Sequence, residues 1–284
     1  ITKTGGGLLQ LSAANTFSGG LTISAGGFIV GASSSLTSLV SAGVGINPAV
    51  NSGPAGSGTL TMASGTRLLT DASSRTLGNP VVFQGQPVFD LVSTSTAYTL
   101  ALNGPITVPA GALTVSVANP AQTVTLGGYF TNASAITSVT KNGLGSLSVN
   151  FTGVGSSVPI TINGGGSLGI ISDGNGTNDN STISLGVITY DAALPVITIG
   201  AAGQSVLFNQ ALNKVIAPSS LVAHLENGMT LTNNSQYGLL VADSIALSST
   251  LGTTGPVYSV STASISTLTQ GLTLSGVISG GSTG

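Results

Sequence analysis

The feature that most constrains the fold is an alternation of apolar and polar residues that recurs along most of the chain. Val, Ile or Leu stands at every second position with Thr or Ser between, as in Leu113–Val117, Val124–Leu126, Leu147–Val149, Ile160–Ile162 and Ile197–Ile199. Successive side chains of a β-strand point to opposite faces, so this alternation predicts half-buried strands. Gly, Asn and Pro residues, which favour turns, separate these segments. The sequence therefore predicts an all-β fold.

The chain also repeats itself. Residues 139–143 (Val-Thr-Lys-Asn-Gly) match residues 1–5 (Ile-Thr-Lys-Thr-Gly) at an offset of 138, and the strand and glycines that follow match at an offset of 139. Self-similarity of this kind is typical of stacked, quasi-one-dimensional architectures. We therefore divide the chain into a first repeat half, residues 1–138, and a second, diverged half, residues 139–284, that continues directly from the first.

Two β architectures fit these observations. In a parallel β-helix, or β-solenoid, rungs of about 20 residues stack roughly 4.8 Å apart. Inward positions then form ladders of aliphatic residues, and outward positions form ladders of Thr, Ser and Asn. Tandem antiparallel β-sandwich domains would also show short alternating strands separated by turns. The stacked repeat favours the β-solenoid, and tandem β-sandwich domains are the alternative.

The N-terminal residues carry a family resemblance. Three blocks, Ile1–Gly7, Leu9–Ser12 and Ala14–Gly26, resemble the passenger-associated transport repeat, also called the autotransporter-associated β-strand repeat. The second copy is similar with one departure, because Phe151–Gly153 stands in place of Asn15–Phe17. The resemblance implies a right-handed parallel β-helix in a secreted or surface-exposed bacterial protein. It implies a structural or adhesive role and no particular chemistry.

The two ends of the chain are compatible with a longer array. Leu272–Leu274 is followed by a glycine-rich polar stretch. If this stretch were joined to Ile1, the two ends together would resemble one uninterrupted repeat module. We therefore expect this chain to be a segment of a longer tandem repeat, continued either covalently or by separate subunits.

The low charge limits the classes of partner. Charged residues are 4% of the chain, against about 25% in an average soluble domain. Five Lys and Arg residues are too few to neutralise a nucleic-acid backbone. No unbroken apolar run of about 18 residues is present, so we predict no transmembrane segment. Low charge density also removes repulsion between copies, which favours head-to-tail or lateral self-association.

The ionisable residues do not predict an active site. A Ser-His-Asp arrangement requires a base, and His224 is the only histidine. It lies in a stretch, 208–226, that departs from the alternation, where Ser219 or Ser220 is placed to cap a short helical turn. The seven acidic residues are widely spaced, and Asp71 with Arg75 is expected to form a surface ion pair. We expect no enzyme activity and no organic cofactor.

One loop is a candidate calcium site. Asp173, Asn175, Thr177 and Asp179 place oxygen atoms at alternate positions, and calcium prefers six to eight oxygen ligands. The loop departs from an EF-hand because its glycine is misplaced and Ser184 stands where a bidentate glutamate is required. The alternative is a solvent-exposed turn, since Asp, Asn and Gly are good turn formers.

Two functions follow from these expectations. The first is a non-catalytic building block of an extracellular bacterial fibre, sheath or surface array. The second is an adhesin-type passenger that binds a host, another cell or a surface glycan. Both predict an extracellular or cell-surface location.

Overall fold

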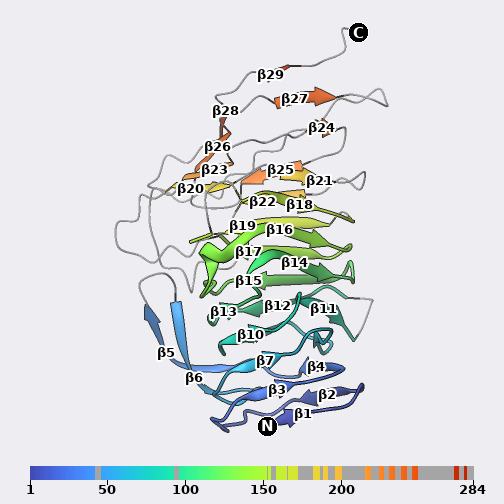
Figure 1. The fold of residues 1–284 in the computed structure, drawn as a ribbon, viewed down its shortest axis with the longest axis vertical. Coiled ribbons are helices and arrows are strands. Elements are labelled where there is room, and N and C mark those ends of the chain that lie inside the picture. Colours follow the sequence, from blue (N-terminus) through green and yellow to red (C-terminus); the bar gives the residue numbers. More distant parts are fainter. Residues whose placement is uncertain are drawn as a thin grey trace.

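The computed structural model of the 284-residue chain describes residues 1–41, 46–92, 96–151, 153–154, 158–164 and 166–171, and strands β20 to β29 of the remainder. In this part of the chain, short strands stack in successive rungs along one axis (Figure 1). Three large sheets form the faces of the stack, and every strand pairing within them is parallel. The predicted β-solenoid is therefore confirmed, and the alternative of antiparallel sandwich domains is wrong for the described strands.

The three faces differ in length. The five-stranded sheet contains, in spatial order, β1 (Thr2–Lys3), β3 (Leu21–Ile23), β7 (Leu60–Met62), β10 (Val81–Phe83) and β13 (Ile106–Thr107). The eight-stranded sheet contains β2 (Leu8–Leu11), β4 (Gly27–Val30), β8 (Arg67–Thr70), β11 (Val88–Leu91), β14 (Gly111–Val117), β16 (Ile136–Asn142), β18 (Ile160–Ile162) and β21 (Ile188–Tyr190). The seven-stranded sheet contains β9 (Arg75–Leu77), β12 (Tyr98–Leu102), β15 (Gln122–Leu126), β17 (Ser146–Asn150), β19 (Ser167–Ile171), β22 (Val196–Ile199) and β25 (Thr230–Asn233).

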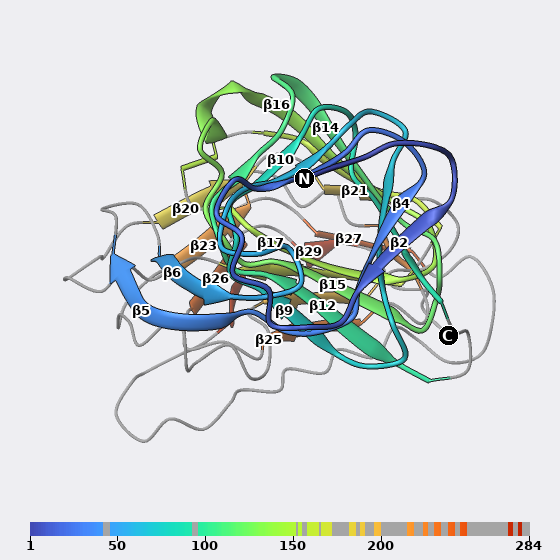
Figure 2. The same ribbon diagram turned by 90° about the horizontal axis from the view of Figure 1, so that it is seen from below.

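The direction of winding is visible from the N-terminal end. In Figure 2 the chain passes from the five-stranded sheet to the eight-stranded sheet and on to the seven-stranded sheet in a clockwise sense while it recedes from the viewer. The solenoid is therefore right-handed, as most parallel crossover connections are. The eight-stranded and seven-stranded sheets both contain strands from before and after residue 138, so the two proposed repeat halves share their sheets.

Smaller sheets complete the described strands. A four-stranded sheet contains β20 (Thr182–Leu185), β23 (Val215–Pro218), β26 (Gly238–Val241) and β28 (Leu272–Leu274), and a three-stranded sheet contains β24 (His224–Glu226), β27 (Ile245–Ser248) and β29 (Ile278–Ser279). The prediction of a helical turn within 208–226 is wrong at β23 and β24, which are strands, while Ser219 and Ser220 lie outside the described residues. In the described part of the chain, the one helical segment is a 3-10 turn, Ala133–Ala135.

One element leaves the solenoid. Strands β5 (Ser35–Ser41) and β6 (Ile46–Ser52) pair antiparallel with each other and form a two-stranded sheet of their own. In Figures 1 and 2 this hairpin extends outward from the side of the lower rungs. We call it the β5–β6 arm.

Most rungs are longer than the expected 20 residues. Paired Cα positions are 20 residues apart at Thr2 and Thr22, 21 at Leu60 and Val81, and 25 at Val81 and Ile106. The rung between β3 and β7 is longest, since Leu21 and Leu60 are 39 residues apart and the β5–β6 arm is inserted between them. Insertions at the corners therefore lengthen the rungs without interrupting the stacked strands.

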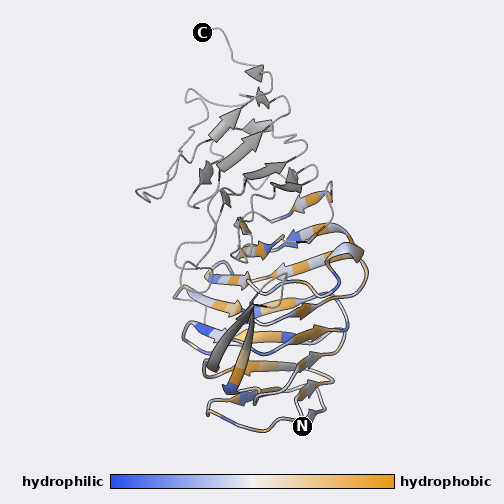
Figure 3. Ribbon diagram, turned by 90° about the vertical axis from the view of Figure 1, so that its left-hand side faces the viewer, coloured by the Kyte–Doolittle hydropathy of each residue, from blue (hydrophilic) through white to orange (hydrophobic). Residues whose placement is uncertain are grey.

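The apolar positions of the alternation form one continuous core. Leu113, Val115 and Val117 of β14 are at most 1% exposed, while the threonine and serine between them are half-buried. The apolar and polar bands that alternate along the strands are visible in Figure 3. Full burial of each such side chain stabilises the fold by about 1.5–3 kcal/mol. The core predicted from the alternation is confirmed over the described residues.

One corner of the solenoid requires glycine for close backbone contact. Gly104 lies above Asn79, and Gly128 lies above Gly104, where a Cβ atom on Gly128 would lie 1.7 Å from the Gly104 carbonyl oxygen. The buried amide of Asn79 donates hydrogen bonds to the carbonyl oxygens of Gly56 at 3.0 Å and Gly58 at 2.8 Å. The corner is thus closed by backbone and side-chain amides in place of apolar packing.

Candidate functional site

The first repeat copy contains a lysine whose ammonium group closes a corner. Strand β1 ends at Lys3, and the chain turns through a glycine-rich segment into β2. The Lys3 ammonium donates hydrogen bonds to the carbonyl oxygens of Gly5 at 2.6 Å, Ala25 at 2.7 Å, and Gly7. An ammonium group has three protons to donate, so these three acceptors satisfy it. Because Ala25 belongs to the next rung, the lysine connects two consecutive rungs.

The second copy contains the same arrangement. Strand β16 carries Lys141, which is 0% exposed, and its ammonium donates to the carbonyl oxygen of Gly143. A glycine of the next rung faces each ammonium: a Cβ atom would lie 2.6 Å from Lys3 Nζ on Gly26 and 2.8 Å from Lys141 Nζ on Gly166. Both glycines have positive φ, 72° and 70°. The sequence repeat therefore extends to the structure of the corner, and we call these two sites the lysine corners.

The two lysine corners occupy different places in the cross-section. The first joins the five-stranded sheet, which contains β1 and β3, to the eight-stranded sheet, which contains β2 and β4. The second joins the eight-stranded sheet, which contains β16 and β18, to the seven-stranded sheet, which contains β17 and β19. The repeated unit is therefore a local strand–corner–strand module. Its second copy lies one face further around the solenoid axis than its first.

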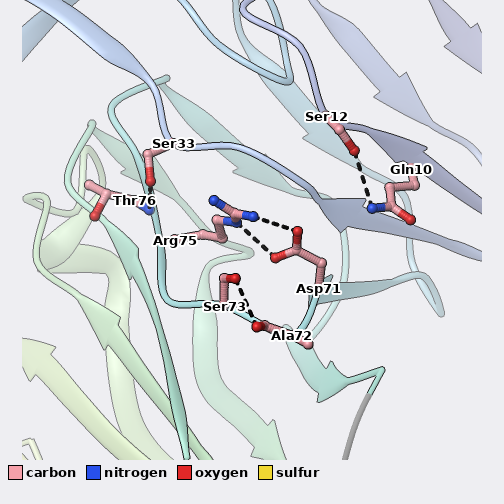
Figure 4. Close-up of polar contacts among 8 residues, drawn as sticks. All are labelled: Gln10, Ser12, Ser33, Asp71, Ala72, Ser73, Arg75 and Thr76. Carbon is pink, nitrogen blue, oxygen red and sulfur yellow. Dashed lines mark hydrogen bonds and ion pairs between the residues drawn. The ribbon is translucent and has the colours of Figure 1, made fainter.

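The remaining charged side chains of residues 1–171 form surface ion pairs. Figure 4 shows Arg75 beside Asp71, with Nε 2.7 Å from Oδ1 and Nη2 2.5 Å from Oδ2. Hydrogen bonding to Asp71 raises the pKa of the Arg75 guanidinium above its usual value. Arg67 Nη1 lies 3.6 Å from Asp90 Oδ2, and the two side chains are 49% and 30% exposed. The predicted pair of Asp71 and Arg75 is confirmed, and neither pair resembles a catalytic arrangement of acids.

The described residues do not test the calcium hypothesis. Asp173, Asn175, Thr177 and Asp179 lie outside them, so the candidate calcium site stays a prediction. Within the part of the chain that the structure describes, no group of three or more His, Cys, Asp or Glu residues is arranged to hold a metal ion. No helix in that part has the length and apolarity needed to cross a membrane.

Reasoning from sequence missed the role of the two lysines. Lys3 and Lys141 served to align the repeat copies, and no structural role was predicted for them. The signal was present in the spacing, because each lysine is followed by a glycine two residues later and by a second glycine after another two. A positive charge next to a glycine-rich turn is well placed to bind the turn's exposed carbonyl oxygens.

Comparison with known proteins locates the family relationship in the first module. No match was found among curated proteins or among solved structures. Residues 1–30 match the family model of the passenger-associated-transport-repeat, and these residues include the first lysine corner and strands β1 to β4. The resemblance is thereby confirmed over this segment: residues 1–30 of the chain form a passenger-associated-transport-repeat on a β-solenoid.

Proposed function

We propose that this chain is a non-catalytic structural segment of an autotransporter-type passenger, displayed outside a bacterial cell as part of a fibre, sheath or surface array. The family match at residues 1–30 supports a passenger-type repeat region and a secreted or surface location. A parallel solenoid suits this role because each rung is hydrogen-bonded to its neighbours, so the fold extends along its axis by adding rungs.

One observation carries the proposal. Every charged side chain among the described residues up to 171 has a partner: Lys3 and Lys141 bind backbone carbonyl oxygens, and Asp71–Arg75 and Arg67–Asp90 are ion pairs. Acid–base catalysis requires a positioned group that gains or loses a proton near neutral pH. In this region the charged groups make contacts that hold the fold together, which favours a structural role.

The β5–β6 arm favours the alternative, an adhesive passenger. It extends from the solenoid as a separate two-stranded sheet, and an isolated two-stranded hairpin is only marginally stable in water. Contact with a host surface, another cell or a glycan would stabilise such a hairpin.

Electron microscopy of the purified chain, with its mass measured under denaturing conditions, tests the structural proposal. We expect ordered filaments or arrays that dissociate to 27.5 kDa chains. Isolated rods that bind cells or a glycan array, and lose this binding when residues 35–52 are replaced by a short Gly-Ser linker, would instead establish the adhesive function. Cleavage of a glycan by the chain would contradict both the structural and the adhesive function.

A trypsin digest under native conditions provides a second test. Among the described Lys and Arg residues, both lysines are held in corners and both arginines are in ion pairs. We expect the native chain to persist under conditions that digest the denatured chain to completion. Rapid native cleavage after Lys3, Arg67, Arg75 or Lys141 would argue against a rigid structural rod.

A further inference from the structure

The chain contains five Asn-Gly pairs, and three of them lie in the part that the structure describes. The described pairs begin at Asn103, Asn142 and Asn163, while the pairs at Asn175 and Asn227 lie outside it. An asparagine before glycine is chemically labile, because glycine has no Cβ atom to keep its backbone nitrogen away from the side-chain amide of the asparagine. The fold determines which of these pairs can react in the native protein.

The pair at Asn142 lies at the second lysine corner. Asn142 is the last residue of β16, and Gly143, whose carbonyl oxygen accepts a hydrogen bond from Lys141, begins the turn. Gly143 has a φ of 89°, and a Cβ atom there would lie 2.4 Å from the Val117 carbonyl oxygen. The corner therefore requires glycine at position 143, whereas the residue equivalent to Asn142 in the first copy is Thr4.

The atoms that react in a deamidation are free at Asn142. Within the described part of the chain, neither the Gly143 N–H nor the Asn142 side-chain nitrogen donates a hydrogen bond. Both residues are half-buried, so water reaches them. The Asn163 amide donates a hydrogen bond to Asn142 Oδ1 at 3.0 Å. A donor at this oxygen stabilises the negative charge that develops there when a nucleophile adds to Cγ.

The other two described pairs are less favourably placed. Asn103 is 7% exposed, so water and base reach it only when the surrounding rungs open. Asn163 is half-buried, but its side-chain nitrogen, which has to leave in the reaction, is held by the hydrogen bond that it donates to Asn142. Access to water and a free leaving nitrogen therefore coincide at Asn142.

We propose that Asn142 is a site of spontaneous deamidation in the folded protein. Hydroxide or water removes the proton of the Gly143 N–H, and the nitrogen attacks Cγ of Asn142. The new N–Cγ bond closes a cyclic succinimide, the Cγ–Nδ2 bond breaks, and the side-chain nitrogen leaves as ammonia. Water then opens the ring at either carbonyl carbon, which gives aspartate or isoaspartate at position 142. No oxidation or reduction takes place in these steps.

The reaction changes the second lysine corner. Isoaspartate carries the backbone through the side chain and lengthens it by one carbon directly before Gly143, whose carbonyl oxygen binds the buried Lys141 ammonium. Either product replaces a neutral amide with a carboxylate, so the formal net charge changes from −2 to −3 (−2 − 1). The first corner has Thr4 at this position and cannot react in this way. Deamidation thus weakens one lysine corner with age and leaves the other intact.

Peptide mass spectrometry of the full chain, incubated at mildly alkaline pH below its unfolding temperature, tests the proposal. Each Asn-Gly pair is followed in the native and in the urea-denatured chain, and an unincubated sample corrects for conversion during digestion. We expect native Asn142 to convert at least about tenfold faster than native Asn103, because the buried pair must first open. Methylation by a protein isoaspartate methyltransferase should label the peptide that contains position 142.

Asn142→Thr is the matched variant, because it gives the second corner the residue of the first. We expect this variant to keep its urea-unfolding midpoint after incubation, whereas the incubated wild-type chain should unfold at a lower urea concentration than the fresh chain. If Asn142→Thr does not fold, Asn142→Gln makes the same comparison, since glutamine cyclises far more slowly than asparagine.

Two results would overturn the proposed modification. One is a native Asn142 that stays intact over the time in which the denatured chain converts completely. The other is conversion of Asn142 and Asn103 at equal rates in the native chain, which would mean that the fold does not select the site. Neither result bears on the proposed structural function, which electron microscopy tests separately.

Discussion

The two lysine corners are built from the same residues but stand in different surroundings. The Lys3 corner lies in the first described rungs, where Lys3 is half-buried, whereas the Lys141 corner lies in mid-stack and Lys141 is 0% exposed. Each ammonium faces a positive-φ glycine of the next rung, yet the corners connect different pairs of sheets. The comparison shows that the module specifies a local turn and its lysine, but not which two sheets the turn joins.

The largest expected effect comes from placing a charge in the core beside each corner. Ile23 and Ile162 are equivalent positions, directly above Lys3 and Lys141 in the register, and both are fully buried. Replacing either with Asp places a carboxylate inside the solenoid, above a lysine whose ammonium already binds backbone carbonyl oxygens, and we expect a loss of about 4 kcal/mol. We expect Ile162→Asp to unfold the rungs on both sides of β18 and Ile23→Asp to affect mainly the first rungs.

Amide hydrogen exchange measures this difference, because it reports opening strand by strand. Replacement by Val at the same positions provides the control for loss of shape alone. Normal exchange protection across β16 to β19 in Ile162→Asp would show that this position does not face the core.

The next largest loss of stability is expected from adding a side chain to the glycine that faces each ammonium group. We expect this loss to be similar at the two corners. Gly26 and Gly166 both have φ near +70°, and a Cβ atom on either would lie within 2.4 Å of a carbonyl oxygen of the previous rung. Alanine at either position therefore combines backbone strain with a steric clash, and we expect each variant to lose about 3 kcal/mol of unfolding free energy. Urea unfolding of Gly26→Ala and Gly166→Ala measures the loss.

Gly6→Ala is the matched control, because a Cβ atom there meets no atom within 4 Å and its φ is not in the left-handed region. Its unfolding midpoint should stay close to that of the wild type. A small effect of Gly166→Ala together with a large effect of Gly26→Ala would mean that the second corner is not a copy of the first.

Removal of the ammonium group should destabilise the protein by different amounts at the two corners. Lys141→Met removes a fully buried ammonium group and leaves the carbonyl oxygen of Gly143 without this donor, at a cost of about 1–3 kcal/mol. Lys3→Met leaves carbonyl oxygens that water can reach, so we expect a loss of about 1 kcal/mol or less. Urea unfolding of the two variants measures the difference. Lys→Arg at each position keeps the positive charge but replaces the ammonium with a planar guanidinium, and so tests whether stability depends on the shape of the charged group. Equal losses would show that burial does not distinguish the corners.

Sequence patterns predicted the repeating strands better than the corners. The alternation identified inward residues such as Val115 and Ile160 because side-chain direction in a strand follows directly from sequence spacing. Rung length was underestimated because insertions such as the β5–β6 arm occur at corners, where no periodic pattern constrains the chain. The lysine corners were missed because the lysines bind backbone carbonyl groups, which every residue carries, both within the following turn, as at Gly5 and Gly143, and in the next rung, as at Ala25.

The smallest expected effect lies away from both corners, at the Asp71–Arg75 pair. The two side chains are four residues apart and about a quarter exposed, and their geometry is bidentate. Pairs at such exposure contribute about 0.2–1 kcal/mol, so Asp71→Asn should lower the unfolding free energy by less than about 1 kcal/mol at low salt. Raising the ionic strength should reduce the difference further, since salt screens exposed charges. A loss as large as that of Lys141→Met would mean that surface charges stabilise this fold as strongly as buried ones, and the buried lysine corner would then have no special energetic role.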